Sequence, residues 1–184
     1  DGDGRDEVAV LFGGTPGGVA GYSVSQDGTP TPIDGLVAIV GNNPVNIDAA
    51  DLNNDGREDL IVANSTDNSI SVLLTMEDLD GSLYFDVTTT PMPRGGQSIT
   101  CVAVIDWDGD TDLDAVVGVD IDNENLEDGY QVLLDVSSTM TIELWLEIAD
   151  YQLPDDSYVS DPPTCVDGGD QSSSWGFVGG TRHG

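Results

Sequence analysis

The stretch DLNNDGRED, residues 51–59, has a second version further along the chain, DWDGDTDLD, residues 106–114. Both copies carry oxygen-bearing side chains at relative positions 1, 3, 5 and 9, and each copy runs directly into a short apolar stretch. A tight loop turns every second side chain inward, so these oxygens and the carbonyl of position 7 can surround one calcium ion at about 2.3–2.6 Å. We therefore expect both stretches to be calcium-binding loops.

The residues that follow the two loops distinguish them from EF-hands. An EF-hand loop needs a bidentate Glu at position 12 and a helix on each side, but position 12 is Val62 in the first loop and Val117 in the second. The runs Leu60–Ala63 and Ala115–Gly118 are short and rich in β-branched residues, which is typical of buried strands. The ion is therefore expected in the loop of a β-hairpin.

A further motif near the start of the chain points to a family. Phe12-Gly13-Gly14-Thr15-Pro16 resembles the Phe-Gly-Gly-Ala-Pro signature of FG-GAP repeats, and it follows a segment, 1–7, that resembles the end of a third acidic loop. With the two complete loops, most of the chain resembles the FG-GAP or VCBS repeats that form the blades of integrin-α-like β-propellers. This resemblance implies calcium as the bound ion and a propeller-type fold.

The resemblance also implies which residues bind calcium. The implied ligands are Asp51, Asn53, Asp55, the backbone of Arg57 and Asp59 in one loop, and Asp106, Asp108, Asp110, the backbone of Asp112 and Asp114 in the other. A weaker third site would use Asp1, Asp3 and Glu7, which align with positions 3, 5 and 9. Thr111 stands at position 6, where the family has glycine, while Gly109 lies two positions earlier. We therefore expect the second loop to bend differently, although its extra carboxylate should still attract the ion.

The repeats predict an all-β fold. Matching positions recur at nearly equal intervals, from Asp3 to Asp55 and from Asp51 to Asp106, and regular recurrence of this kind indicates stacked units. We divide the single repeat region, 1–184, into units of about 1–50, 51–105 and 106–169, with a degenerate partial unit at 170–184 in which no calcium is expected. Strands are expected at Leu60–Ala63, Ser69–Leu74, Leu83–Thr88, Ser98–Ile105 and Ile142–Ile148.

About three four-stranded blades would be incomplete as a propeller, because propellers close with roughly four to eight blades and an open arc leaves apolar faces uncovered. Two explanations stay open. The chain could be part of a larger propeller, or several copies could complete one another. A head-to-tail contact that does not close would give a filament.

Composition restricts partners and location. With 35 acidic and 4 basic side chains, the chain lacks the Lys and Arg that nucleic-acid binding needs. It has no apolar run long enough to cross a bilayer, so membrane insertion is not expected. Cytosolic calcium is too scarce to fill weak loops of this kind, so we expect an extracellular or cell-surface protein. A saline habitat is the competing explanation for the acidity.

Three further features bear on an extracellular role. Asn64-Ser65-Thr66 is a glycosylation sequon just after an expected strand, which suits an exposed position. Cys101 and Cys165 are the only cysteines; an oxidising compartment favours an intrachain disulfide, and two buried thiols are the alternative. Trp107, Trp145 and Trp175 are expected to pack between blades, with a ligand platform as the alternative.

The sequence does not predict an enzyme. The only histidine is His183, near the end of the chain, which leaves few groups for nucleophilic or zinc catalysis. The expected function is that of a noncatalytic, calcium-binding extracellular repeat protein with a structural or adhesive role. Its partners would be further copies of itself, another extracellular protein, or glycans. The alternative is a noncatalytic propeller or carbohydrate-recognition module of a larger secreted enzyme.

Overall fold

The computed structural model describes side chains for residues 7–92, 98–107 and 109–120, and the backbone of seven strands beyond residue 120. Every regular element among these residues is a β-strand, and each pair of neighbouring strands is antiparallel. The described residues therefore contain no helix that could span a membrane. The predicted all-β class is confirmed.

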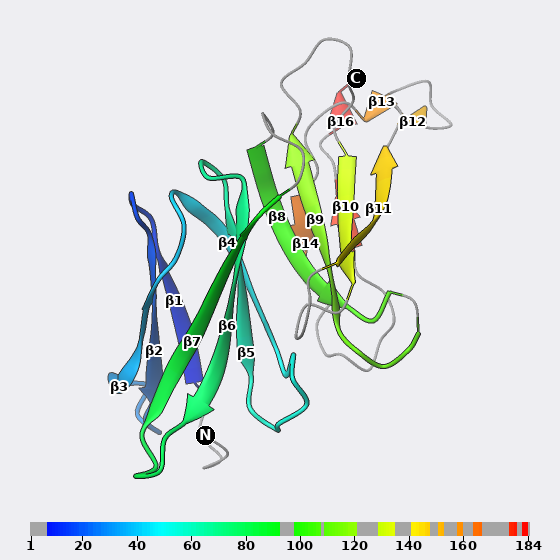
Figure 1. Ribbon diagram of the computed structural model, residues 1–184. Helices are drawn as coiled ribbons and strands as arrows, with labels where there is room; N and C mark the ends of the chain where they lie inside the picture. Colours follow the sequence, from blue (N-terminus) through cyan, green and yellow to red (C-terminus); the bar gives the residue numbers. More distant parts are fainter. Residues whose placement is uncertain are drawn as a thin grey trace.

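Three sheets hold most of the described chain (Figure 1). The first sheet consists of β1 (Glu7–Phe12), β2 (Gly18–Val24) and β3 (Pro30–Ile39). The second consists of β4 (Pro44–Ala50), β5 (Asp59–Asn64), β6 (Ser69–Glu77) and β7 (Leu83–Pro91). The third consists of β8 (Ser98–Ile105), β9 (Asp114–Asp120), β10 (Gly129–Leu134) and β11 (Thr141–Glu147).

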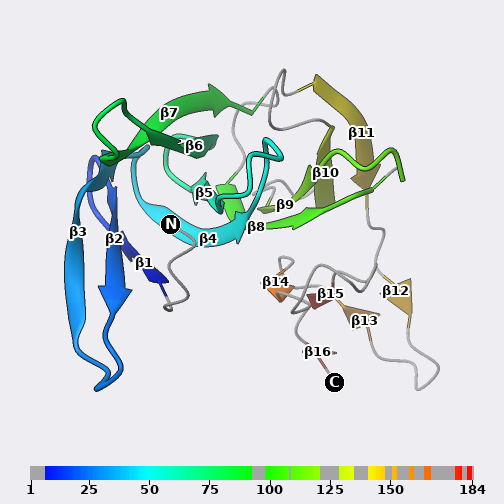
Figure 2. The ribbon, with the colours of Figure 1, turned by 90° about the horizontal axis from the view of Figure 1, so that it is seen from below.

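Two smaller sheets follow along the chain. One pairs β14 (Thr164–Val166) with β15 (Phe177–Gly179), and the other contains β12 (Tyr151–Gln152), β13 (Tyr158–Val159) and β16 (Arg182–His183). Viewed from below, the sheets are arranged around a common centre, with β1, β4, β8 and β14 nearest to it (Figure 2). This is the arrangement of propeller blades.

The sheets are offset from the sequence repeats by one strand. The repeat period places the break before each acidic loop, but the strand before the loop pairs with the strand after it. Thus β4 pairs with β5 across residues 51–58, and β8 pairs with β9 across residues 106–113. Each acidic loop is therefore the turn of a β-hairpin inside one sheet, as expected.

Among the described side chains, the core consists of two apolar layers, one on each side of the second sheet. All six residues of β5 are buried. Leu60 and Val62 face the first sheet, where they pack with Val19 and Val40, whereas Ile61 and Ala63 face the third sheet. The second sheet is thus covered on both faces, which explains why its central strand reads as a continuous apolar run.

Backbone contacts fix the joint between the first two sheets. The N–H of Asn43 donates to the carbonyl of Gly14 at 2.8 Å, and the N–H of Gly17 donates to the carbonyl of Gly41 at 3.0 Å. The Phe12–Pro16 signature therefore ends against the segment that leads into β4. At the outer side, Gly35 has φ +88°, and a Cβ there would collide with the carbonyl oxygen of Leu83 in β7. Glycine is required at this position because the two sheets approach too closely for a side chain.

Candidate metal centre

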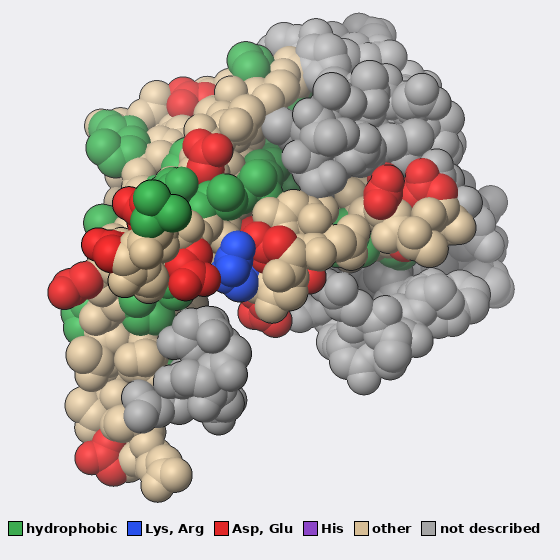
Figure 3. Space-filling model, turned by 60° about the horizontal axis from the view of Figure 1, so that its bottom comes forward, with side chains coloured by type: hydrophobic (Ala, Val, Ile, Leu, Met, Phe, Trp, Pro, Cys, Tyr) green, Lys and Arg blue, Asp and Glu red, His purple; other side chains and the backbone are tan. Residues whose placement is uncertain are grey.

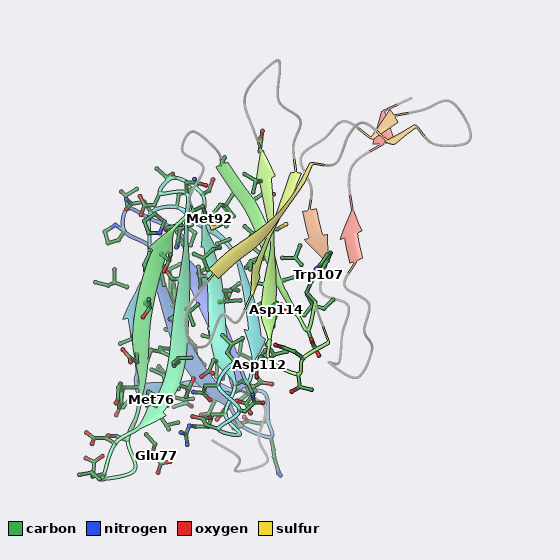
Figure 4. All side chains as sticks on the ribbon, turned by 45° about the vertical axis from the view of Figure 1, so that its right-hand side comes forward. Met76, Glu77, Met92, Trp107, Asp112 and Asp114 are labelled. Atoms are coloured by element: carbon green, nitrogen blue, oxygen red, sulfur yellow. The ribbon has the colours of Figure 1, made fainter. Side chains whose placement is uncertain are left out.

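The two acidic loops lie at the same end of the molecule. Both connect strands at the lower end in Figure 1, and Figure 4 shows Asp112 and Asp114 at the lower end of the third sheet. We number both loops from 1 to 9, so that position 1 is Asp51 or Asp106 and position 9 is Asp59 or Asp114. Position 9 is also the first residue of the following strand, β5 or β9.

Carboxylate and amide oxygens turn inward in the first loop. Asp51 accepts hydrogen bonds from the N–H of Asp55 (3.0 Å) and the N–H of Gly56 (2.9 Å). The Oδ1 of Asn53 also accepts from the N–H of Asp55 at 3.0 Å. The Oδ1 of Asp55 in turn accepts from the N–H of Arg57 at 2.9 Å. Positions 1, 3 and 5 therefore point their oxygens into one tight turn.

The second loop repeats two of the hydrogen bonds of the first loop. Asp106 accepts from the N–H of Gly109 (2.8 Å) and the N–H of Thr111 (3.3 Å), and the Oδ1 of Asp110 accepts from the N–H of Asp112 (2.9 Å). In both loops, position 1 accepts from position 6, and position 5 accepts from position 7. Asp108, the predicted ligand at position 3, lies outside the described residues.

The expected difference in bend between the loops is wrong. Positive φ occurs at positions 4 and 6 in both, at Asn54 (58°) and Gly56 (86°) in the first loop and at Gly109 (80°) and Thr111 (82°) in the second. The glycine has only changed place: the first loop has Asn then Gly, and the second has Gly then Thr. Left-handed backbone is costly for a β-branched residue, so Thr111 is a strained position in a backbone path that both loops share.

The aspartate at position 9 connects each loop to the strand that follows it. Asp59 and Asp114 are 0% and 2% exposed. The N–H of Leu52 donates to Oδ2 of Asp59 at 3.1 Å, and the N–H of Trp107 donates to Oδ2 of Asp114 at 2.7 Å, so position 2 donates to position 9 in both loops. Asp59 also accepts from the N–H of Thr75 in β6 at 2.7 Å. These aspartates therefore link loop and sheet.

Burial makes Asp59 an unfavourable place for a lone negative charge. Desolvation raises the pKa of Asp59 above its ordinary value, and the nearby charge of Asp55 raises it further, although the hydrogen bonds from Thr75 and Leu52 oppose this shift. A buried carboxylate of this kind is stabilised by a cation at close range. The loop thus presents a negative charge that a bound cation would compensate.

The donor set suits a hard cation more than a soft one. At its proposed ligand positions the first loop offers three carboxylates, the amide oxygen of Asn53 and backbone carbonyls. Oxygen ligands of this kind are those that calcium prefers. Within the described part of the chain, no three His, Cys, Asp or Glu side chains converge as a metal cluster. A metal at the first loop, all of whose residues are described, would therefore depend on amide and backbone oxygens as well as carboxylates.

Other predicted site residues have mixed outcomes. Asp1 and Asp3 lie outside the described residues. Glu7 is the first residue of β1, in the place that Asp59 has in β5, but Glu7 is exposed rather than buried. The exposed fraction of the Trp107 side chain is 44%, which does not fit packing between blades; the side chains of Trp145 and Trp175 are outside the described residues.

The expected exposed position of Asn64 is wrong. Asn64 ends β5 and is 0% exposed. Its Nδ2 donates to the hydroxyl oxygens of Ser69 (3.2 Å) and Ser71 (2.9 Å) in β6. The sequon pattern could not reveal this, because the chain leaves the strand one residue later than expected. The folded protein does not present the nitrogen that glycosylation would modify.

Cys101 is disulfide-bonded in the structure. It lies in β8, which contacts β14, the strand that contains Cys165. The side chain of Cys165 is outside the described residues, so its identity as the partner stays a prediction.

The loops, the hairpins around them and the glycine-rich segment after β1 are features of one repeat class. A family model described as FG-GAP-like repeat matches residues 1–62 and again residues 51–117. The chain belongs to the FG-GAP-like repeat family. The two matches overlap at the first acidic loop and together span more than half of the chain. No curated protein and no solved structure matches it significantly. The narrower likeness to VCBS or integrin-α repeats stays a prediction.

Sequence reasoning missed one role in this FG-GAP-like loop, that of the Arg57 side chain. The loop motif predicts only a backbone ligand role for Arg57, but the guanidinium of Arg57 forms an ion pair with Asp55 at 2.7 Å. The available signal was composition, because a basic residue inside an acidic loop of a chain with only four basic residues is unusual.

Proposed function

We propose that this protein is a noncatalytic, calcium-stabilised FG-GAP-like repeat module with a structural or adhesive role outside the cell. The observation that carries the proposal is the agreement between the two loops. They share inward-turned oxygens at positions 1 and 5, left-handed backbone at positions 4 and 6, and a buried aspartate at position 9. Two loops with different sequences thus have one arrangement, and it favours a cation.

Calcium would act on the fold through the hairpins. Asp51, Asn53, Asp55, Asp59 and the carbonyl of Arg57 would hold one ion, and the matching residues of 106–114 would hold another. Bound calcium supplies positive charge that offsets the carboxylates. Because position 9 begins β5 or β9 and bonds back to position 2, a loop held in this shape fixes the register of its hairpin.

The charge of the chain supports an extracellular location. The formal net charge is −31, and such an excess opposes compaction unless cations are bound. Sites with a dissociation constant of about 0.1 mM would each add about 1.4 kcal/mol at millimolar calcium, a level found outside cells.

Thermal unfolding with and without calcium tests the proposal. We expect the unfolding midpoint to rise in millimolar calcium relative to EDTA, and to rise little when sodium chloride of equal ionic strength replaces calcium. The sodium arm tests the competing saline explanation, because a protein adapted to salt would respond to both. An equal response to calcium and sodium would contradict specific binding.

A self-associating role is favoured by the outer face of the first sheet, the face turned away from the second sheet. Cross-strand neighbours in register place its apolar residues together, and these are Val8, Val10, Phe12, Ala20, Tyr22, Val37 and Ile39. Val37 and Ile39 are 70% and 71% exposed, and Val8 and Phe12 are 46% and 47% exposed. Exposed apolar patches of this kind mark interaction sites.

The repeat indicates which kind of partner would cover the outer face of the first sheet. Counting from Glu7 and Asp59, the first residues of β1 and β5, Val8 and Val10 correspond to Leu60 and Val62, which the first sheet buries. The corresponding face of the second sheet is therefore covered by a sheet of this same repeat. We assign the outer face to a second copy of the chain, which carries such sheets.

Sedimentation velocity tests this assignment. Self-association is expected to be lost in Val37→Asp and Ile39→Asp, while Val45→Asp, at an exposed valine in β4 outside the face, should leave it intact. Monomeric wild-type protein at all concentrations would overturn the assignment to a second copy. If the monomeric wild-type protein bound glycans, the carbohydrate-recognition alternative would replace the assignment to a second copy.

A further inference from the structure

The Arg57 side chain contacts one residue of its own loop and two residues of β6. One guanidinium nitrogen (Nη2) lies 2.7 Å from Oδ2 of Asp55, and the other (Nη1) lies 3.5 Å from Oε2 of Glu77. The Nε–H donates to the carbonyl of Thr75 at 3.0 Å. The side chain therefore joins position 5 of the loop to two residues of β6, and it is only 27% exposed.

Among the described side chains, this guanidinium is the one Lys or Arg charge, and it lies in an acidic region. In Figure 3 the basic side chain among the acidic ones is that of Arg57, since the described part of the chain includes no other Lys or Arg side chain. The first loop has four carboxylates and this guanidinium, whereas the second has five carboxylates and no basic residue. Position 7 of the second loop is Asp112. The two loops thus share a backbone path but differ in charge.

We propose that Arg57 is a tethered cation that stabilises loop 51–59 without metal and lowers the calcium affinity of that loop below that of loop 106–114. The inference rests on the proposed function, since it concerns the same metal sites. Its physical basis is competition. Asp55 is a proposed ligand, and the same carboxylate already accepts from the guanidinium and from the backbone N–H of Arg57.

Charge and geometry act in the same direction. An ion that binds Asp55 must share the carboxylate with a fixed positive charge, and like charges repel. Ligand charge count and rigidity also tune calcium affinity in loops of this type. The hydrogen bond to the carbonyl of Thr75 and the contact with Glu77 favour a guanidinium that stays beside Asp55 when the ion binds.

The consequence is a division of roles between the loops. Loop 106–114 fills first and depends on calcium for its shape. Loop 51–59 keeps its hairpin at low calcium, because Arg57 offsets part of its charge, and it fills only at higher calcium. The second sheet, which packs on both of its neighbours, is thereby the part least sensitive to loss of the ion.

The first experiment measures the metal-free state. The variant Arg57→Met keeps the apolar stem and removes the charge. In EDTA its unfolding midpoint should fall below that of wild type. Arg182→Met removes the same formal charge in β16 and should not produce this fall. An unchanged midpoint for Arg57→Met in EDTA would overturn the first half of the proposal.

The second experiment measures calcium binding by calorimetry. The parent protein carries Asp3→Ala and Asp110→Ala, so that loop 51–59 is the remaining site. Adding Arg57→Met should lower the calcium dissociation constant at least about fivefold, as expected for removing a like charge beside a ligand. Adding Arg182→Met should leave it nearly unchanged. The calcium-induced rise in the unfolding midpoint should be larger with Arg57→Met than without it.

The outcomes separate the two proposals. If the parent binds calcium and Arg57→Met leaves the affinity unchanged or weaker, Arg57 is a structural residue only and this inference is overturned. The inference is also overturned if Arg57→Met loses as much stability in calcium as it loses in EDTA. If the parent shows no calcium binding, the proposed function fails at this loop, and the inference fails with it.

Discussion

The Oδ1 of Asn46 in β4 accepts a hydrogen bond from the backbone N–H of Val102 in β8 at 2.8 Å. Two positions further along each strand, Oδ2 of Asp48 accepts from the N–H of Val104 at the same distance. Strand β8 is at the end of the third sheet, so these alternate N–H groups point away from β9 and need partners outside the sheet. The second sheet supplies those partners through side chains.

Removing one of these acceptors should weaken the joint between the second and third sheets. Asn46→Ala leaves a partly buried N–H without its partner, and we expect a loss of about 1–2 kcal/mol in the free energy of unfolding. Asn46→Asp keeps an acceptor oxygen and serves as the control. Urea denaturation measures both. Equal stabilities of the two variants would show that the hydrogen bond contributes nothing.

Replacing Thr111 should stabilise the second loop. Its φ of 82° is unfavourable for a β-branched residue, so Thr111→Gly is expected to raise the free energy of unfolding by about 1 kcal/mol. The reverse change, Gly56→Thr, should be destabilising at the equivalent position. Asn54→Gly should have little effect, because asparagine tolerates this region. A loss of stability in Thr111→Gly would contradict the strain.

The buried position of Asp59 predicts a pH dependence in EDTA. Because its pKa in the folded protein is raised above 3.8, the folded state binds the proton more tightly than the unfolded state. This contribution to stability is fully present below pH 3.8 and is lost as the pH rises through the folded pKa. The stability of wild type relative to Asp59→Asn should therefore decrease from pH 3.8 towards neutral pH.

The same comparison in saturating calcium is the control for that measurement. A bound ion favours the ionised carboxylate, so calcium should reduce or reverse the trend. Guanidinium denaturation at several pH values would detect it. If the free energy of unfolding of wild type relative to Asp59→Asn increased with pH in EDTA, the raised pKa would be contradicted.

The disulfide of Cys101 should stabilise the contact between the third sheet and β14. Cys101 has the place in its repeat that Asn46 has in the repeat before. Asn46 bonds to the following sheet, and the disulfide would replace that contact with a covalent one. Reduction should cost about 2–4 kcal/mol, whereas Cys101→Ser should be insensitive to reductant. Peptide mapping under non-reducing conditions should show a peptide that joins Cys101 to Cys165, and its absence would contradict the pairing.

The strands and hairpin loops could be predicted because local pattern determines them. The run Leu60–Ala63 is apolar on both faces. The acidic loops carry oxygen-bearing side chains at positions 1, 3, 5 and 9, and this spacing predicts oxygens that turn inward. The assignment of strands to sheets could not be read in the same way. The repeat begins at the loop, but pairing depends on the hairpin, which joins β4 to β5 across it.

Other parts of the site depend on tertiary contacts that a motif does not contain. The burial of Asn64 follows from Ser69 and Ser71 in the neighbouring strand. Both acidic loops have positive φ at positions 4 and 6, but the glycine is at position 6 in the first loop and at position 4 in the second. The shape of loop 106–114 could therefore not be predicted from the position of its glycine. The role of Arg57 depends on Thr75 and Glu77 in β6, which lie far from the loop motif in the sequence.

Anomalous diffraction from crystals grown with calcium is the most direct test of the central claim, that both acidic hairpin loops bind this ion. The account predicts one anomalous peak inside loop 51–59 and one inside loop 106–114, each about 2.3–2.6 Å from oxygens of positions 1, 3, 5, 7 and 9. Loops that stay empty of anomalous density in saturating calcium, with the hydrogen bonds of Asp51 and Asp106 unchanged, would contradict it.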